Sequence, residues 1–445
     1  MKKPGKVNPD SPWLDKRGNF IPPLLATHLI ENENFIFDRG CLHYFDGKVY
    51  RPEGEIFVKS KCKEILETEY RDSRGIEVFR QIVTEITFKS PRLDRDITWI
   101  VLRNGCLDWK TGQLVPHDPA ILSSIFIPID HDPEATCPKI EKFFGQVLPT
   151  DAIDILFEFF GYCLIPDNRF EKALLLLGKG HNGKGLTIRL LRAFLGDENV
   201  SSESLQDVAE NRFRMAKLAG RLANAFPDLD NRALKQTGTF KALVSGDAIS
   251  AENKFGQPFT FENKARMIFS MNEIPRSADS TYAFYRRLCI IRFSLQLTPE
   301  TSDPFLFEKL TTENELSGLL NKALAALRVL VEVGRFSEPL SSKNELEHYR
   351  SDNETVRVFC ESQCELNPDY QIKKRELFAA YLHWAAESDI RPLTSRQFKT
   401  GLLQFAKTVT EDQAGPAINR VRIFRGINLT AAAQTNFYSE GPDEK

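Results

Sequence analysis

Hydrophobic and polar positions alternate along the first third of the chain in short runs that turns interrupt. Asp46-Gly47 separates two β-prone runs, which is typical of a hairpin, and a second hairpin is expected within Asn104–Pro116. Between them, residues 56–88 carry charges at helical spacing. The pattern therefore predicts an α+β module over residues 28–136, preceded by a flexible arm over 1–27 that is rich in Pro, Gly and charge.

From Cys137 onward the apolar residues recur every three or four positions, which predicts a helical segment over 137–166. A continuous apolar strand, Lys172–Leu177, then leads through a glycine-rich turn into an amphipathic helix, Leu186–Leu195. Three more apolar strands are expected, with helical stretches between them: Arg221–Phe226, Arg266–Met271 and Leu288–Phe293. Strands that alternate with helices predict an α/β domain with a parallel sheet, here over 167–336 and closed by the helix Glu315–Val331.

The last part of the chain shows helical spacing again and then β alternation. Ser337–Asn344 is polar and is interpreted as a linker. Helices are expected around Glu347–Cys364, Lys374–Ala385 and Ser395–Ala406, and a strand pair near Val409–Glu411 and Arg420–Phe424. Helices followed by a β-ribbon predict a winged helix over 345–431, with a polar tail over 432–445.

Composition narrows the class of protein. A length of 445 residues exceeds a single compact core, and a net charge of −2 excludes a chain that is basic throughout, so contact with nucleic acid has to come from local patches. No apolar run approaches the ~18 residues that span a bilayer, and the first lysines precede no apolar segment of a signal peptide, so a cytoplasmic location is expected. The eight cysteines form no CxxC pair; buried thiols are expected, and a zinc site at Cys360 and Cys364 is the alternative.

The strongest chemical signal lies in the turn after the strand Lys172–Leu177. Its glycines allow successive backbone N–H groups to point at phosphate oxygens, the following helix N-terminus adds a positive dipole, and Lys184 adds a charge. ATP is therefore the expected ligand, with these residues around its phosphates: Gly178, Gly180, Asn182, Gly183, Lys184, Gly185 and Leu186. Gly185 replaces the Ser or Thr whose hydroxyl usually helps to hold Mg²⁺, so the metal has to rely on waters and a downstream acid, or Thr187 has to reach it.

Later positions complete the pattern of an ATPase. A carboxylate at the end of a neighbouring strand has to hold Mg²⁺, and Asp228 is the first choice and Asp230 the second. Asn272 ends the next apolar strand, where an amide can orient the attacking water. Arg286 and Arg287 precede the last strand, and an arginine can stabilise the charge on a transferred phosphoryl group from a neighbouring subunit. A solvated turn and a solvated basic pair are the alternative interpretations of these acids and arginines.

Taken in order, these motifs resemble those of superfamily-3 helicases, specifically the C-terminal half of phage and plasmid primase-helicases, a group related to the poxvirus uncoating NTPase. The resemblance covers about residues 35–430. It rests on these stretches: Asn104–Asp108, Val115–His117, Phe159–Leu164, Gly180–Gly185, Phe240–Asp247, Met271–Pro275, Tyr285–Leu288, Phe378–Trp384 and Gly426–Leu429. The glycine at position 185 is similar to a variant seen in this family.

The resemblance implies an AAA+-type core behind a helical collar, a homohexameric ring that hydrolyses ATP between subunits, and 3′-to-5′ movement along single-stranded DNA. It implies that Arg287 is the arginine finger, with Arg286 as the alternative. It also implies that the loop between Gly246 and Phe261 is a DNA-contacting hairpin with Lys254 near its tip. Such a helicase would replicate a phage, plasmid or other mobile element in the cytoplasm of its host.

One departure from the family concerns primer synthesis. Full-length relatives carry a primase module ahead of this region, whereas no paired-acid primase signature precedes the α+β module here. We therefore expect that this chain makes no primers itself and works with a primase supplied in trans.

Basic residues near the C-terminus predict contact with duplex DNA. Arg396 and Lys399 lie on an expected helix, and Arg420 and Arg422 alternate with apolar residues on the following strand, as in a wing laid against phosphates. Two other functions fit parts of the pattern. An ATP-dependent origin-binding initiator or loader would share every motif without processive unwinding, and a P-loop small-molecule kinase would behave as a monomer.

Overall fold

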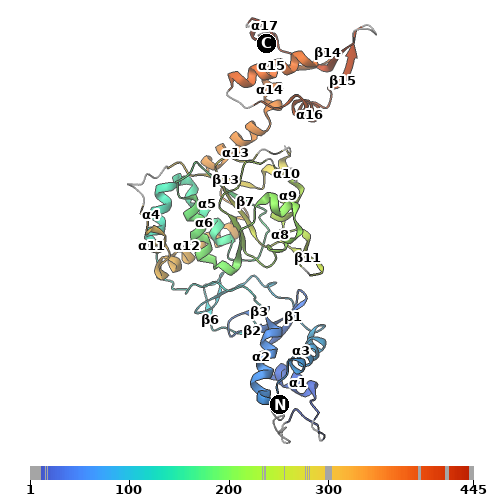
Figure 1. Cartoon of the computed structure of the whole chain (residues 1–445). Coiled ribbons are helices and arrows are strands. Elements are labelled where there is room, and N and C mark those ends of the chain that lie inside the picture. Colours follow the sequence, from blue (N-terminus) through green and yellow to red (C-terminus); the bar gives the residue numbers. More distant parts are fainter. Residues whose placement is uncertain are drawn as a thin grey trace. The chain divides into compact units, whose positions relative to one another are not determined.

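The computed structural model describes residues 12–439 except 16, 18, 233, 235–236, 255, 276, 278, 280, 296–302, 389–391 and 416–419, and leaves four side chains within helices (352–353 and 438–439) undescribed. The chain divides into two compact units, one formed by residues 1–231, 238–273 and 287–342 and the other by 232–237, 274–286 and 343–445. Figure 1 shows the elements of both units along the chain. We describe each unit by itself.

The first unit begins with three helices and a small antiparallel sheet, β1 (Phe35–Asp38), β2 (Cys41–Phe45) and β3 (Tyr50–Arg51). The expected first hairpin is confirmed, because Phe45 pairs with Tyr50 across the Asp46-Gly47 turn. Helices α1 (Pro22–Asn32), α2 (Gly54–Leu66) and α3 (Asp72–Ile86) bury a separate apolar cluster that includes Leu25 and Ile82. Helix α1 begins inside the segment expected to be a flexible arm, because Leu25 belongs to this cluster; residues 1–11 of that arm lie outside the described residues.

A second antiparallel sheet, β4 (Trp99–Leu102), β5 (Gly105–Asp108) and β6 (Leu114–Val115), confirms the second expected hairpin. Ile100, Leu102 and Leu107 of this sheet belong to the main core of the unit, where Trp109 is also buried together with residues of the later helices. Val101 and Cys106 form a small separate cluster with Val49. Arg328 donates a hydrogen bond from Nε to the backbone oxygen of Trp109 over 2.7 Å. The expected domain boundary at residue 136 is therefore not a boundary in packing.

The centre of the first unit is a five-stranded sheet in which every pairing is parallel. Its order is β13 (Leu288–Arg292), β7 (Ala173–Leu177), β12 (Arg266–Met271), β9 (Ala223–Phe226) and β8 (Val200–Ser201). The α/β fold and the parallel sheet predicted from the alternation of strands and helices are confirmed. Strand β8 was not predicted, since two residues give no alternation to detect.

Helices lie against both faces of this sheet (Figure 1). Besides α1 to α3, the described helices of the unit are α4 (Pro138–Val147), α5 (Ile153–Tyr162), α6 (Lys184–Leu195), α7 (Leu205–Glu210), α8 (Arg212–Ala216), α9 (Thr237–Ser245), α11 (Leu306–Leu310) and α12 (Glu313–Val333). Helices α5 and α12 approach closely because residue 161 is glycine: a Cβ there would lie 2.3 Å from the backbone oxygen of Ala323. This contact joins the predicted helical segment 137–166 to the predicted closing helix.

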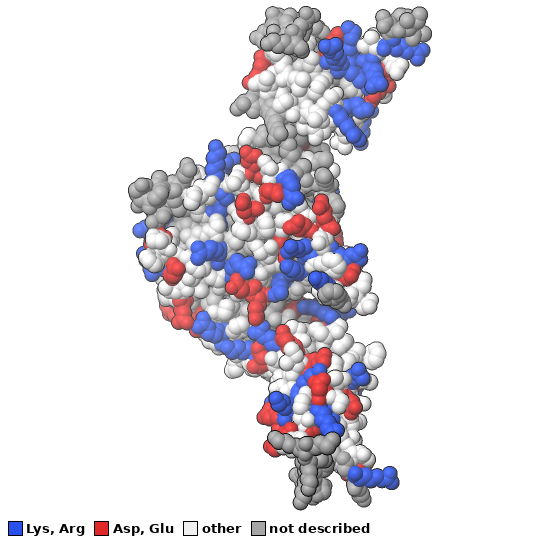
Figure 2. Space-filling model, in the orientation of Figure 1, with Lys and Arg blue, Asp and Glu red and all other residues white. Residues whose placement is uncertain are grey.

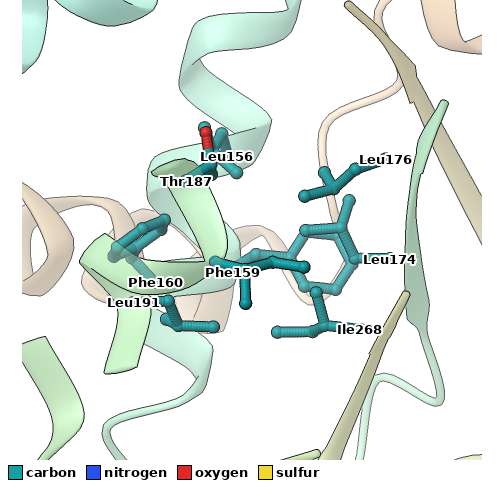
Figure 3. A pocket seen from close by; sticks show the side chains of 9 residues that line it. Leu156, Phe159, Phe160, Leu174, Leu176, Thr187, Leu191 and Ile268 are labelled. Atoms are coloured by element: carbon teal, nitrogen blue, oxygen red, sulfur yellow. The ribbon is translucent and has the colours of Figure 1, made fainter. Parts of the chain in front are cut away.

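A small cavity lies between α5, α6 and strands β7 and β12. Figure 3 shows its lining, in which Phe159, Leu174 and Ile268 surround the space and Thr187 contributes the hydroxyl. A nucleotide needs several polar partners, which this lining does not offer. The cavity is therefore a packing gap in the core, and the candidate site lies elsewhere.

A long antiparallel hairpin, β10 (Ala248–Glu252) and β11 (Pro258–Glu262), connects α9 to the central strand β12. Its outer positions are exposed, and Phe259 and Phe261 lie side by side with ring centroids 5.9 Å apart. The hairpin coincides with the segment that the resemblance predicted as DNA-contacting.

The second unit contains α10 (Tyr282–Tyr285), α14 (Thr355–Gln363), α15 (Lys374–Glu387), α16 (Ser395–Phe405), α17 (Ala431–Ser439) and most of α13 (Leu340–Asn353). Its three-stranded antiparallel sheet has the order β14 (Cys364–Lys373), β16 (Val421–Leu429) and β15 (Thr410–Ala414). The expected helices and strand pair are present, and a capping box at Thr394 starts α16. Three expectations need correction: α13 begins inside the expected linker, β14 was not predicted, and the expected polar tail begins with α17, which buries Ala433.

Two features are absent from the described residues. No described helix combines the length and the apolar character that crossing a bilayer would require. No three His, Cys, Asp or Glu side chains gather there as a metal site would need, so the alternative of a zinc site at Cys360 and Cys364 gains no support.

Candidate nucleotide site

The glycine-rich loop lies between β7 and α6, at the carboxyl edge of the parallel sheet. Strand β7 is flanked by β13 on one side and by β12 on the other, and both partners run parallel to it. In open α/β sheets, ligands bind outside the carboxyl ends of the strands. The fold thus places the loop where a ligand site is expected.

Two glycines of the loop adopt backbone conformations that other residues rarely do. Gly178 has φ of 156°, and a Cβ there would lie 2.3 Å from Nδ2 of Asn182 and 2.6 Å from the backbone oxygen of Phe293. Gly183 has φ of 94°, in the left-handed region, and precedes the first residue of α6. A Cβ at Gly183 would also crowd Val147 and Phe143 of α4. Glycine at these two positions therefore allows the tight turn whose backbone N–H groups a chain of phosphates requires.

Lys184 is the first residue of α6, and its side chain is only 6% exposed. Its ammonium donates to the backbone oxygen of Gly178 and to Oδ1 of Asn182, the latter over 3.1 Å. Asn182 is itself fixed, because its Nδ2 donates to the backbone oxygen of Phe293 over 3.2 Å. Oxygen atoms of the loop thus bind the Lys184 ammonium, and this ammonium lies inside the glycine-rich turn.

The electrostatics of the loop identify its acidic neighbour. Burial lowers the pKa of the Lys184 ammonium, and the negative charge of Asp228 opposes that change. Asp228 follows β9 and is exposed, and the next residue, Leu229, donates its backbone N–H to Ser270 of β12 over 2.8 Å. Among the two predicted acids, Asp228 is therefore the one whose charge acts on the lysine, which favours it over Asp230.

Two positions at the start of α6, Gly185 and Thr187, decide whether a side-chain hydroxyl can reach Mg²⁺. Gly185 is exposed, and a Cβ there would meet no atom within 4 Å. Thr187 is 2% exposed and donates its hydroxyl to the backbone oxygen of Gly183 over 3.0 Å. The burial of this side chain and the direction of its hydroxyl toward Gly183 disfavour Thr187 as a metal ligand in this conformation. A cradle with one lysine and one nearby carboxylate fits a magnesium nucleotide, since Mg²⁺ is usually held by one or two carboxylates, waters and phosphates.

The remaining loop residues and the predicted amide lie at the same edge of the sheet. Gly180 has open space around its Cα, and Leu186 is half-buried in the first turn of α6. Asn272 follows β12 directly and is exposed. Because β12 pairs with β7, Asn272 ends the strand next to the loop.

Arg287 is held inside its own unit, which argues against the predicted finger role. It is 8% exposed, and its Nη2 donates to Oγ of Ser245 over 2.7 Å and lies 3.0 Å from Oε2 of Glu171. An arginine finger has to extend from one subunit into the site of another. Arg286 is half-buried and becomes the better candidate of the pair. Glu171 was missed because nothing in its local sequence marks it, and Ser245 lies in the stretch Phe240–Asp247 that carries the resemblance but was given no role.

The predicted DNA-binding residues lie in both units. Lys254 is exposed in the turn between β10 and β11 of the first unit. In the second unit, Arg396, Arg420 and Arg422 are exposed, whereas Lys399 pairs with Glu411 at 2.8 Å. Figure 2 shows Lys and Arg side chains gathered over the part of the second unit that contains α16 and the sheet. The prediction that Arg420 and Arg422 share one side of an alternating strand holds only in part, because Val421 between them is also exposed.

Two family models match separate parts of the chain. Residues 28–149 match the family described as D5 N terminal like, and residues 176–287 match a family of unknown function (DUF5906). The second match contains the glycine-rich loop, both acids, the hairpin and both arginines.

Two curated viral proteins are similar to part of the chain. A "putative helicase" of Acanthamoeba polyphaga mimivirus is 27% identical over 288 residues, which is 62% of this chain and 30% of that protein. A "putative helicase" of Invertebrate iridescent virus 3 is 23% identical over 281 residues, which is 56% of this chain and 29% of that protein. The chain thus spans about 30% of the length of these relatives.

Solved structures of the NrS-1 C-terminal region are also similar. One apo structure is 13% identical, with a TM-score of 0.48, and the match covers 92% of this chain and 99% of that one. Another apo structure is 14% identical, with the same TM-score of 0.48 and 91% of this chain covered.

Proposed function

We propose that this chain, a member of the primase-helicase family, is an ATP-dependent DNA helicase that replicates a phage, plasmid or other mobile element. The observation that carries the proposal is the placement of Lys184: a glycine-rich turn at the carboxyl edge of a parallel sheet surrounds a buried lysine on which the charge of Asp228 acts. Few arrangements other than a phosphate site place a buried cation inside an open glycine cradle.

Each residue of the site has a proposed task. The backbone N–H groups from Gly178 to Leu186 would bind the phosphates of ATP, and Lys184 would neutralise the β- and γ-oxygens. Asp228 would hold Mg²⁺ through its carboxylate, and Asn272 would orient the water. Bound magnesium ATP would supply the free energy of hydrolysis. Arg286, rather than Arg287, is the residue that we propose as the finger offered to a neighbouring subunit.

The proposal extends to assembly and to DNA. A finger in trans requires a ring or filament of identical subunits, and we propose a homohexamer. Lys254 on the β10–β11 turn would contact the backbone of a single strand inside the ring, with 3′-to-5′ movement, and a primase would act in trans. In this proposal the glycine-rich loop is a P-loop, the central sheet and its helices form an AAA+ core, and the C-terminal part of the chain is a winged helix.

The test is unwinding of a forked DNA with a 3′ tail. Wild type and Lys184→Ala are compared with and without ATP and Mg²⁺, and Lys179→Ala, which changes an exposed lysine of the same loop, serves as the matched control. We expect ATP-dependent strand release by wild type and Lys179→Ala, and none by Lys184→Ala. Absence of ATP hydrolysis by the wild type would refute the nucleotide site.

A second function is favoured by the exposed Arg396, Arg420 and Arg422 of the second unit, which suit duplex phosphates. An origin-binding initiator or loader would hydrolyse ATP in response to DNA without releasing strands processively. DNA-stimulated hydrolysis without strand release on the fork would select this function over the helicase.

A further inference from the structure

The β10–β11 hairpin joins the rest of its unit through two feet, Leu243–Gly246 at the end of α9 and Asn263 after β11. Gly246 has φ of +76°, and a Cβ there would lie 3.1 Å from Cβ of Asn168 and 3.2 Å from the backbone oxygen of Asn263. The first foot therefore packs tightly against the second foot and against the turn that precedes β7. A movement of the hairpin relative to the rest of the unit therefore has to change these contacts or move the residues that make them.

Buried amides tie the two feet together. Asn263 is fully buried and donates from Nδ2 to the backbone oxygen of Leu243 over 2.8 Å. Asn168 donates to the backbone oxygen of Asn263 over 2.7 Å and accepts from Nη1 of Arg266 over 2.6 Å. Buried polar networks of this kind are rigid when their members are paired, because breaking one bond leaves a polar group without a partner. The feet thus behave as one body with the turn around Asn168.

A charged contact joins the first foot to the amino edge of the sheet, at the opposite end of β7 from the glycine-rich loop. Ser245, the last residue of α9, accepts a hydrogen bond from Arg287 over 2.7 Å, and the same guanidinium nitrogen lies 3.0 Å from Glu171. Glu171 precedes β7, whose other end is the glycine-rich loop, and Arg287 follows Arg286 directly in the chain. The backbone oxygen of Arg287 also accepts from the N–H of Ala173 over 2.7 Å.

We propose that the Ser245–Arg287–Glu171 contact is a latch with Arg287 as a positioning residue. It couples the finger segment, which is the chain around Arg286, to the hairpin foot, and β7 connects it to the glycine-rich loop. The inference rests on the proposed function, since it assigns Arg287 a task within that machinery. A displacement of the finger segment moves the Arg287 guanidinium, and the latch transmits that displacement to Ser245 and to β10. Ser245 is the residue to change, because the contact between Arg287 and the hairpin foot described above is made by the Ser245 hydroxyl. Removing this hydroxyl leaves the backbone of the foot unchanged.

The test removes that hydroxyl with Ser245→Ala. Ser250→Ala, which removes an exposed hydroxyl from β10 of the same hairpin, is the matched control. We expect Ser245→Ala to keep basal ATP hydrolysis and the thermal midpoint, and to lower both DNA stimulation and the number of base pairs opened per ATP about fivefold or more, the range of a typical coupling between sites. Ser250→Ala should match wild type. Coupling in Ser245→Ala equal to that of the control would overturn the latch.

Hydrogen exchange of residues 248–262 gives a readout that needs no unwinding. In wild type and Ser250→Ala, addition of a non-hydrolysable ATP analogue with Mg²⁺ should change exchange in the hairpin, and in Ser245→Ala that change should be lost. Glu171→Gln, which keeps an acceptor but removes the charge, should retain part of it. If the wild type binds nucleotide and shows this response but releases no strand, the helicase assignment fails and the latch stands; if exchange is identical in all variants, the latch fails whatever the unwinding result.

Discussion

Replacing Gly185 tests whether the loop presents this position to Mg²⁺. Gly185 is the second residue of α6, it is exposed, and a new Cβ would meet no atom within 4 Å, so serine fits without rearrangement. Replacing a helical glycine by serine also stabilises the helix by roughly 0.5 kcal/mol, because glycine loses more conformational freedom on folding. Gly185→Ser therefore adds a hydroxyl at the place where related loops carry one, at no cost in packing.

The expected gain is in the response to metal. A hydroxyl that replaces one water on Mg²⁺ exchanges similar interactions, so we take its net contribution as that of an ordinary hydrogen bond, about 1 kcal/mol, or about fivefold in the half-saturating Mg²⁺ concentration. The measurement is ATP hydrolysis at saturating ATP across a Mg²⁺ titration. Gly185→Ala is the control, because alanine stabilises the helix at least as much and offers no oxygen.

The two variants separate helix stability from coordination. We expect Gly185→Ser to shift the titration to lower Mg²⁺ and Gly185→Ala to leave it near wild type, while both raise the thermal midpoint. Identical titrations for serine and alanine would refute the reasoning that position 185 faces the metal. The resemblance of this turn to a magnesium-dependent phosphate loop would then be one of backbone shape alone.

Three further predictions follow from other parts of the structure. Arg420→Glu combined with Arg422→Glu should weaken duplex binding and make the slope of log affinity against log salt shallower by roughly 2, as measured by anisotropy; an unchanged slope would exclude these residues from phosphate contact. Gly161→Ala places a Cβ 2.3 Å from the backbone oxygen of Ala323 and should cost about 1–3 kcal/mol in urea unfolding, whereas Gly145→Ala, in helix α4 with open space at Cβ, should stabilise the protein slightly. Burial raises the pKa of Glu158 above its ordinary 4.5, so the folded state binds more protons than the unfolded state and stability should fall as pH rises from 4.5 through the raised pKa; Glu158→Gln should lose this dependence, and parallel pH profiles of the two proteins would contradict it.

The central sheet was predictable because its longer strands are mostly apolar, as strands covered on both faces are. Strand β12 was predicted with the bounds it has, and β7 within one residue. Strand β14 was missed because Asn367-Pro368-Asp369 is typical of a turn; in the structure the pairing with β16 shifts register between Leu366 and Gln371, and the strand continues beyond that irregularity. Pairing across an irregular segment depends on tertiary contacts that a local pattern does not contain.

In the candidate site, too, one part could be predicted from the sequence and another could not. The glycine-rich loop was predictable because all its parts lie within a few residues of one another. The burial of Arg287 was not, since a basic pair before an apolar strand has the same sequence whether it is solvated, extended toward a neighbour or paired internally. Its partners Glu171 and Ser245 come from two other elements, and only the fold brings the three together.

The hydrogen bonds of Lys184 have a consequence for how the protein responds to changing ATP levels. An ammonium has three N–H donors, and the loop's own oxygens on Gly178 and Asn182 accept from it. One donor is thus available to a phosphate oxygen, and a phosphate that takes a second donor has to displace one of these two loop oxygens, which are tethered at a high effective concentration. This internal competition raises the ATP concentration needed for half occupancy, and it disfavours ligands with too little negative charge to displace a loop oxygen. Asn182→Ala would weaken the internal competition, so it should lower discrimination between ATP and AMP even where it leaves the loop folded.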